Sequence, residues 1–397
     1  MKCILHIGLQ KCGSTSLQKW LFANRDALKA HGILYPKTLG IPNHKFLTAL
    51  GMTFEKKHWV IEDTGARTLE DFKNWKQQIA QQFKEELDAV SDRVETLVIS
   101  HEDLSRLGDV GVQRCVTWLR DYVDEITLVG YVRPPAEMAN SFLSQSAKNG
   151  EMVDPEAYLG QFRVNFTRVA NRWAERVDGA RWRSLSQVDD VVGDFCSVLK
   201  IDPRAFKTVP RTNQALSKEA FELLHHLNLK FRIGDRKNYN RMMFVEELPS
   251  KQSFKIARSD ALDIQTRHAA EVQSFVALVP EISPEHLEVD LDRYPEDVTL
   301  SSAAPAYTPE LRFIIRRLNA QIWLEKSIGR MNLAEAMISD GRKKRARELL
   351  GAAGAHLNRA AQVDADQVTS DVANLRLRLE KLYGVVQAMA GRGGKQP

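Results

Sequence analysis

The first twenty residues constrain the fold more than any other stretch of this chain. Residues 3–8 read Cys-Ile-Leu-His-Ile-Gly, which is typical of a short buried strand, and residues 17–28 carry apolar side chains at helical spacing. The turn between them has glycines at positions 8 and 13 and three hydroxyl side chains at 14–16. The first amides of a helix have no partners within it, and its dipole favours negative charge there. The segment therefore predicts an anion-binding strand–turn–helix unit.

The position of the lysine in this turn separates two classes of phosphate-binding loop. The magnesium-nucleotide loop reads G-x-x-x-x-G-K-[ST], with its lysine directly after the second glycine. Here Ser14 stands at that position, and the lysine is Lys11, two residues before Gly13. The placement counts against a P-loop kinase or NTPase, as does the lack of a clear strand ending in a magnesium-binding aspartate. That class stays as an alternative, beside an ordinary strand-to-helix turn with a capping serine.

Strand-like and helix-like patterns alternate through the first half of the chain. Further apolar runs are typical of buried strands, and they lie at 32–36, 96–100, 126–132 and, more weakly, 181–185. Helical spacing covers 68–90, 111–123, 135–148, 155–176, 189–199 and 217–230. The stretch 37–66 has no such period and is interpreted as a long irregular loop. Alternation of this kind predicts an α/β fold with a parallel sheet flanked by helices.

Three chemically interesting segments are expected at one edge of that sheet. In parallel α/β sheets, ligands bind at the carboxyl ends of the strands. Residues 11–16, 101–102 and 133 each lie at or just beyond the carboxyl end of a predicted strand. We therefore expect them to lie close together.

The last quarter of the chain has a different pattern. Residues 301–309 are rich in Ser, Ala and Pro and are interpreted as a linker. In the region 310–397, residues 310–389 show almost continuous helical spacing, which predicts two or three antiparallel helices. The sequence thus predicts an α/β domain over 1–300 and an all-helical extension. The extension is a candidate surface for self-association.

Charge and cysteine usage narrow the class of protein. Residues 300–397 contain 16 Lys and Arg against 9 Asp and Glu, whereas the rest of the chain contains 40 against 42. A nearly neutral body does not fit a nucleic-acid-binding face. The absence of a long apolar run or a leader predicts no membrane span and no secretion. Four dispersed cysteines without a C-x-x-C pair fit reduced thiols in the cytoplasm and predict no zinc site.

Two stretches resemble a known family. HIGLQKCGSTSLQ resembles the 5′-phosphosulfate loop of the bacterial and carbohydrate-type sulfotransferases that use 3′-phosphoadenosine 5′-phosphosulfate (PAPS), except that Cys12 replaces a small hydroxyl residue. LVGYVRPPAEMANSFLSQ resembles their 3′-phosphate site, in which Arg133 and Ser141 lie eight residues apart. Arginine offers a planar fork that suits phosphate. The resemblance covers residues 1–300 as architecture and is specific only at 5–18, 97–104 and 129–145.

The resemblance implies a P-loop-type sheet and transfer of a sulfuryl group from PAPS to an acceptor hydroxyl or amine, on a carbohydrate or glycolipid, without a metal ion. Lys11 is then the residue that stabilises the leaving phosphate. The implied donor-binding residues are Lys11, Cys12, Gly13, Ser14, Thr15, Ser16, Arg133 and Ser141. A catalytically inactive binding or scaffold protein that acts through its helical tail is the other alternative.

A general base must take the proton of the acceptor. Glu102 is the first candidate, because the family resemblance extends to Ser100-His101-Glu102. His101 is the second, since an imidazole titrates near neutrality. His44, in the predicted loop, is the third. Each has a structural interpretation as well: Glu102 as a helix cap, His101 as a hydrogen-bonded polar group and His44 as a surface residue.

Overall fold

The computed structural model of the protein describes residues 1–397 except for 152, 211–214, 231–252, 299–308, 364 and 392–397. The chain divides into two compact units, of which the first spans Met1–Arg232 and Ser250–Thr299. The described part of the second unit is helical. The predicted linker 301–309, apart from its last residue, lies outside the described residues.

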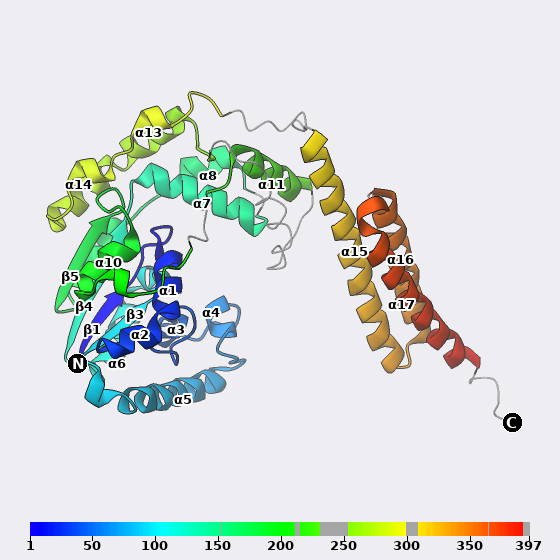
Figure 1. Ribbon diagram of the computed structural model, residues 1–397, viewed down its shortest axis with the longest axis horizontal. Helices are drawn as coiled ribbons and strands as arrows, with labels where there is room; N and C mark the ends of the chain where they lie inside the picture. The colour runs from blue at the N-terminus through cyan, green and yellow to red at the C-terminus, as the bar shows by residue number, and fades with distance from the viewer. Residues whose placement is uncertain (152, 211–214, 231–252, 299–308, 364, 392–397) are drawn as a thin grey trace. The chain divides into compact units, whose positions relative to one another are not determined.

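A five-stranded parallel sheet forms the centre of the first unit (Figure 1). Its strands are β1 (Lys2–His6), β2 (Ile33–Leu34), β3 (Thr96–Ser100), β4 (Glu125–Val132) and β5 (Gly179–Ser184). They pair in the order β2-β3-β1-β4-β5, with every neighbouring pair parallel. The predicted α/β class with a parallel sheet is therefore confirmed, as is an all-helical C-terminal region.

Helices connect the strands and cover the sheet. Their bounds are α1 (Ser14–Ala23), α2 (Arg25–Ala30), α3 (Lys45–Gly51), α4 (Trp59–Glu62), α5 (Leu69–Asp88), α6 (Asp109–Arg120), α7 (Pro135–Asn149), α8 (Pro155–Gln161), α9 (Phe166–Ala174), α10 (Val191–Leu199), α11 (Lys218–Lys230), α13 (Arg258–Arg267) and α14 (Ala269–Leu278). Short 3-10 turns are η1 (Ser91–Arg93), η2 (Glu102–Arg106), η3 (Pro203–Ala205), η4 (Pro284–Leu287) and η5 (Leu291–Arg293). α1 packs against α10, whereas α6 and α14 pack against α9. Right-handed crossovers put these two groups on opposite faces of the sheet.

Two sequence-based assignments in this unit are wrong. The stretch 37–66 is not an irregular loop, because it contains α3 and α4. Both helices are too short for a period to stand out, yet they bury apolar side chains such as Leu47 and Val60. The predicted helix 155–176 is broken into α8 and α9, and between them the Val164 amide donates to His268 Nε2 at 3.3 Å.

The second unit contains α15 (Pro309–Ser339), α16 (Lys343–Val363) and α17 (Ala365–Gly391). Each of them contacts the other two, and small and branched side chains such as Ala334, Leu350 and Val386 fill their shared core. The helical pattern of this region is thus confirmed. Among the described helices of the whole chain, none combines the length and apolar content that a bilayer span requires.

Candidate functional site

A large cleft opens at the carboxyl edge of the sheet. The chain leaves β1 toward β2 on one side and leaves β4 toward β5 on the other, so the two connections diverge between adjacent strands. Such divergence marks the usual ligand crevice of open α/β sheets. The cleft has a volume of about 950 Å³ and is lined by the loop after β1, by α7 and by residues 253–255, among others. Its size is within the roughly 300–1,000 Å³ of small-molecule sites.

The backbone of the loop after β1 depends on its glycines. Gly8 and Gly13 have φ values of 95° and 84°, in the left-handed region that favours glycine. A Cβ at Gly8 would lie 2.9 Å from the Cβ of Glu102, and one at Gly13 would lie 3.1 Å from Cγ1 of Val191. The loop therefore approaches the segments after β3 and β5 closely. α1 begins there with no side-chain cap and no acidic residue in its first turn, which leaves its positive end for an anion.

Lys11 lies on this loop and lines the cleft. Its Nζ donates to Oε1 of Gln145 on α7 at 3.0 Å. Burial, with the positive charges of Lys148 and Arg133, lowers the pKa of Lys11 to about 8, and Glu102 opposes this shift. An anion that entered the cleft would stabilise the ammonium form. Lys11 is thus a cation whose local environment favours a negative ligand.

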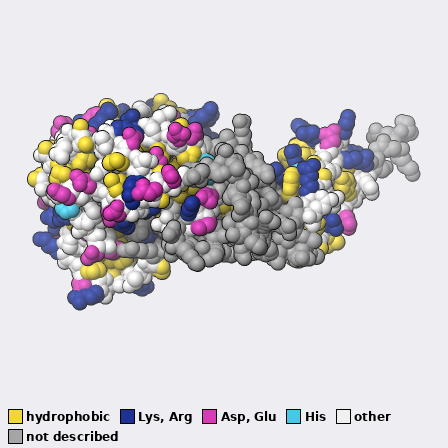
Figure 2. All heavy atoms as spheres, turned by 90° about the horizontal axis from the view of Figure 1, so that it is seen from above, with side chains coloured by type: hydrophobic (Ala, Val, Ile, Leu, Met, Phe, Trp, Pro, Cys, Tyr) yellow, Lys and Arg dark blue, Asp and Glu magenta, His cyan; other side chains and the backbone are white. Residues whose placement is uncertain are grey.

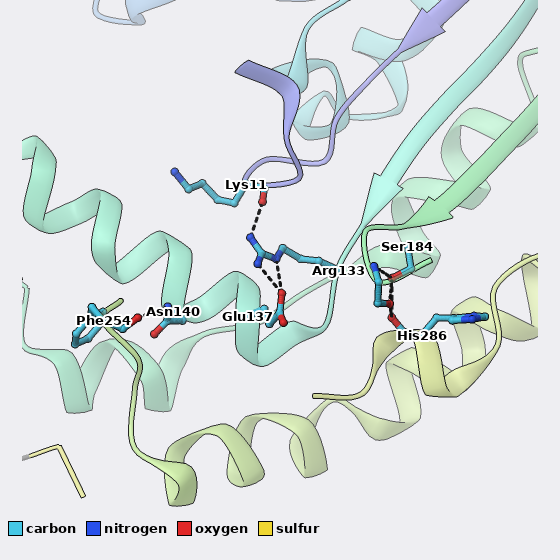
Figure 3. Close-up of polar contacts among 8 residues, drawn as sticks. Lys11, Arg133, Glu137, Asn140, Ser184, Phe254 and His286 are labelled. Carbon is cyan, nitrogen blue, oxygen red and sulfur yellow. Dashed lines mark hydrogen bonds and ion pairs between the residues drawn. The ribbon is translucent and has the colours of Figure 1, made fainter. Parts of the chain in front are cut away.

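Arg133 follows β4 and joins the two predicted donor-binding elements directly. One terminal guanidinium nitrogen, NH1, donates to the carbonyl oxygen of Lys11 at 3.0 Å (Figure 3). Its Nε and NH2 donate to one carboxylate oxygen of Glu137, at 3.1 and 2.5 Å. Arg133 therefore fixes the Lys11 loop, and Glu137 engages the other edge of the guanidinium.

A further cation, which the sequence analysis did not single out, reaches the same part of the cleft. Asn140 accepts from the Ile256 amide at 2.9 Å and donates to the Phe254 carbonyl at 3.2 Å, and Figure 3 draws Asn140 next to Phe254. These bonds hold the intervening Lys255 on the lining. Burial lowers the pKa of Lys255, and Glu137 raises it. In the sequence, Lys255 is one of several cations in the basic stretch 232–258, and nothing local indicates that it lies near Arg133, more than a hundred residues away.

The other predicted donor-binding residues divide into two groups. Gly13, Ser14, Thr15, Ser16 and Ser141 line the cleft. Cys12 does not: its side chain is fully buried in the core, and burial raises the pKa of the thiol to about 12. Its backbone amide donates to the Leu9 carbonyl at 3.3 Å, within the turn itself. The hydroxyl of Ser14 is also largely buried, at 3.5 Å from the Leu9 carbonyl.

Glu102 lines the same cleft as Lys11. It opens η2, directly after β3, and its Oε2 accepts from Nε2 of Gln18 on α1 at 2.8 Å. That contact fixes one oxygen of the carboxylate and leaves the second as a proton acceptor. Of the three candidate bases, Glu102 alone is on the cleft lining.

The two candidate histidines lie in the interior instead. His101 is 1% exposed, and its Nδ1 is 2.7 Å from the hydroxyl of Thr48. His44 is fully buried; its Nδ1 accepts from the Ser100 amide at 3.0 Å, so its Nε2 carries the proton that bonds the Pro36 carbonyl at 2.8 Å. The alternative interpretation of His44 as a surface residue is wrong. Both rings tie the segments around β3 together.

The burial of His44 predicts a measurable pH dependence of stability. Burial lowers the pKa of His44 to about 3, against about 6.5 in the unfolded chain. Below pH 6.5 the His44 ring takes up a proton in the unfolded chain but stays neutral in the folded protein. The free energy of unfolding therefore falls as the pH drops toward 3. At about 1.36 kcal/mol per pH unit, His44 should cost about 2 kcal/mol between pH 7 and pH 5.

Urea unfolding of the wild type and of His44→Gln at both pH values measures this effect. The variant, which has no titrating ring, should lose about 2 kcal/mol less on acidification. His31→Gln, at an exposed ring, is the matched control and should behave as the wild type. An unchanged pH dependence in His44→Gln would contradict the assigned environment.

Charges of both signs are distributed around the site. The cleft lining contains Lys11, Arg106, Arg133, Lys148 and Lys255 together with Glu102, Glu137, Glu151, Asp189 and Asp190. On the face drawn in Figure 2, basic and acidic side chains are likewise interspersed over the described surface. In the described part of the chain, no group of three or more His, Cys, Asp and Glu side chains gathers as a metal-binding cluster. Anion binding in this cleft therefore depends on local groups.

Comparison with known proteins identifies no family for this chain: no family model, no curated protein and no solved structure matches it.

Proposed function

We propose that the protein is a P-loop-type sulfotransferase that moves a sulfuryl group from PAPS to a hydroxyl or amine of an acceptor. The observation that carries this proposal is the direct bond between its two donor elements. Arg133 donates to the carbonyl of Lys11 at 3.0 Å, and both residues line one cleft with Ser141. Two phosphate-recognition elements this close can serve the two ends of a single doubly phosphorylated adenosine.

The chain's residues fit such a ligand in their chemistry. The glycine-bounded loop and the start of α1 would hold the 5′-phosphate through backbone amides and hydroxyls. Arg133, Ser141 and Lys255 would hold the 3′-phosphate. PAPS would supply an activated sulfuryl group whose leaving group is a phosphate. Lys11 would stabilise the negative charge that develops on that phosphate, as electrostatic catalysis requires.

The proposed reaction balances with Glu102 as the base. The sulfur–oxygen bond to the donor phosphate breaks, and a bond from sulfur to the acceptor oxygen or nitrogen forms. The acceptor proton passes to the carboxylate of Glu102, whose orientation Gln18 fixes. The products are adenosine 3′,5′-bisphosphate (PAP) and a sulfated acceptor. A carbohydrate or glycolipid acceptor remains the class that the sequence resemblance implies.

Calorimetric titration with PAP tests the proposal on the full chain. We expect saturable one-site binding in the absence of magnesium, with a clear preference over ATP. Hydrolysis of ATP that requires magnesium, together with no detectable PAP binding, would favour the nucleotide kinase or NTPase class instead. Sulfation of a carbohydrate panel with labelled PAPS then gives the activity itself.

Removing the proposed base should affect turnover and spare donor binding. In Glu102→Gln we expect kcat to fall by about 10²-fold, the lower end of general-base contributions. The amide keeps the size of the side chain and a hydrogen-bonding oxygen, so the PAP dissociation constant should change less than about threefold on the same reasoning. Steady-state kinetics and calorimetry measure the two quantities separately.

Glu95→Gln is the matched control, because Glu95 is exposed and precedes β3 whereas Glu102 follows it. It should match the wild type in both measurements. Full turnover in Glu102→Gln would remove Glu102 as the base.

A further inference from the structure

A second hollow adjoins the proposed donor cleft. Its volume is about 470 Å³, and it lies among α7, α9 and the turn η2. Gln10, Arg106 and Phe142 line both hollows, so the two spaces meet at these side chains. A molecule in the second hollow can therefore reach the cleft that holds Lys11 and Glu102.

The second hollow is strongly positive. Arg106, Arg163, Arg168 and Arg172 line it, and no acidic residue is among the described residues of its lining. Arg172 pairs with Asp109 at 3.5 Å, and Arg106 lies 3.8 Å from Asp103. Arg163 donates to the carbonyls of Gly160 and Phe162, which are neutral. Over the described residues, neither Arg163 nor Arg168 has a carboxylate partner, so their charge is available to a ligand.

The rest of the lining is apolar and partly aromatic. Phe142 and Phe162 lie half-buried with their ring centroids 6.1 Å apart, and Leu9, Met138 and Val169 complete that wall. Aromatic faces of this kind bind the flat or apolar side of a ring. Arginines next to them offer planar forks for a carboxylate, sulfate or phosphate. The hollow therefore combines a ring-binding wall with anion-binding groups.

We infer that the second hollow is the acceptor site and that the acceptor is anionic, with a carboxylate, sulfate or phosphate attached to a ring. The inference rests on the proposed function, because it uses the adjoining cleft as the donor site. The acceptor spans both spaces: its anionic group lies against Arg163 and Arg168, and its nucleophilic hydroxyl reaches Glu102 past Gln10 and Phe142. A neutral acceptor would leave the charge of these arginines unused.

A pair of glycosides tests the charge requirement directly. Phenyl β-D-glucuronide and phenyl β-D-glucoside both carry an aromatic ring and acceptor hydroxyls, and a carboxylate in the first replaces a hydroxymethyl group in the second. With PAP saturating, calorimetry should show the glucuronide binding at least about tenfold tighter, the scale of one charge-assisted contact. Sulfation from PAPS should follow the same order in kcat/KM.

Variants locate the preference in the hollow. The double variant Arg163→Ala/Arg168→Ala should abolish the preference for the glucuronide and leave the PAP dissociation constant unchanged. Arg168→Gln, a single change at an exposed side chain, should reduce the preference at least about threefold. Arg67→Ala, at an exposed arginine outside both hollows, is the matched control and should keep the full preference.

The outcomes separate the inference from the proposed function. Normal PAP binding with equal affinity for the two glycosides, or with no binding of either, overturns the anionic-acceptor inference alone. So does a preference that survives Arg163→Ala/Arg168→Ala. Absence of PAP binding overturns the proposed function, whereas a preference for the glucuronide that is measured without PAP and depends on these arginines still supports an anion site in the second hollow.

Discussion

Replacing Lys11 with alanine should reduce kcat by about 10²- to 10³-fold, the scale for removing one preorganised partner of a developing negative charge. The reason is local. Burial and two neighbouring cations already disfavour the Lys11 ammonium, so its interaction with the leaving phosphate is made in a poorly solvated place. Steady-state kinetics with labelled PAPS measure the loss. Lys29→Ala, at an exposed lysine on α2, is the control and should leave kcat unchanged.

The pH dependence of the wild type provides a second measurement of the same group. The pKa of Lys11 is about 8 in the free protein, so the cation is present below that pH and is lost above it. PAP affinity should therefore fall as the pH rises through 8. Lys11→Arg, which stays charged, should bind PAP with an affinity that is flat over this range. Turnover within threefold of the wild type in Lys11→Ala would remove this cleft from the chemistry.

The residues that could be predicted from sequence are those whose roles are set by their immediate neighbours along the chain. The strand 96–100 has the bounds that its apolar run indicated, and Lys11, Glu102 and Arg133 all follow predicted strands. Strand ends in a parallel sheet converge for reasons of topology alone, so their side chains were expected to share an edge. They do line one cleft.

What escaped prediction depends on contacts between distant segments. His44 looked like a loop residue because nothing near it reveals that its ring bonds Ser100, 56 positions away. Lys255 is held at the cleft by the bonds that its neighbours Phe254 and Ile256 make to Asn140, which lies far away in the sequence. Glu137 is different: it lies only four residues after Arg133, in the first turn of α7, and the sequence analysis did not consider that these two opposite charges could pair. Arg168 and Arg172 also share a helix face, but no pattern indicates what that face meets.

Replacing Arg133 is expected to have a large effect on nucleotide affinity, and the nucleotide that is affected distinguishes two possible roles of this residue. As a phosphate ligand it would recognise the 3′-phosphate, which PAP has and 5′-AMP lacks. As a positioning residue it would act through its bond to the Lys11 carbonyl and affect both nucleotides equally. Arg133→Ala should therefore weaken PAP binding by about 2–4 kcal/mol and AMP binding by much less, on the scale for a preorganised charge partner. Calorimetry with both nucleotides gives the difference, and Arg67→Ala is the matched control.

The variant Glu137→Gln distinguishes the same two roles of Arg133 independently. Its carboxylate holds two nitrogens of the Arg133 guanidinium and must share them with any phosphate that binds there. Removing that negative charge should tighten PAP binding by about threefold to tenfold, since a like-charged neighbour disfavours the phosphate, and should leave AMP binding unchanged. Arg133 would be only a positioning residue for the Lys11 loop if Arg133→Ala lost equal affinity for PAP and AMP and if Glu137→Gln gained no affinity for PAP. The 3′-phosphate assignment would then be wrong even if Lys11 proved essential, because the bond from Arg133 to the Lys11 carbonyl would explain the losses by itself.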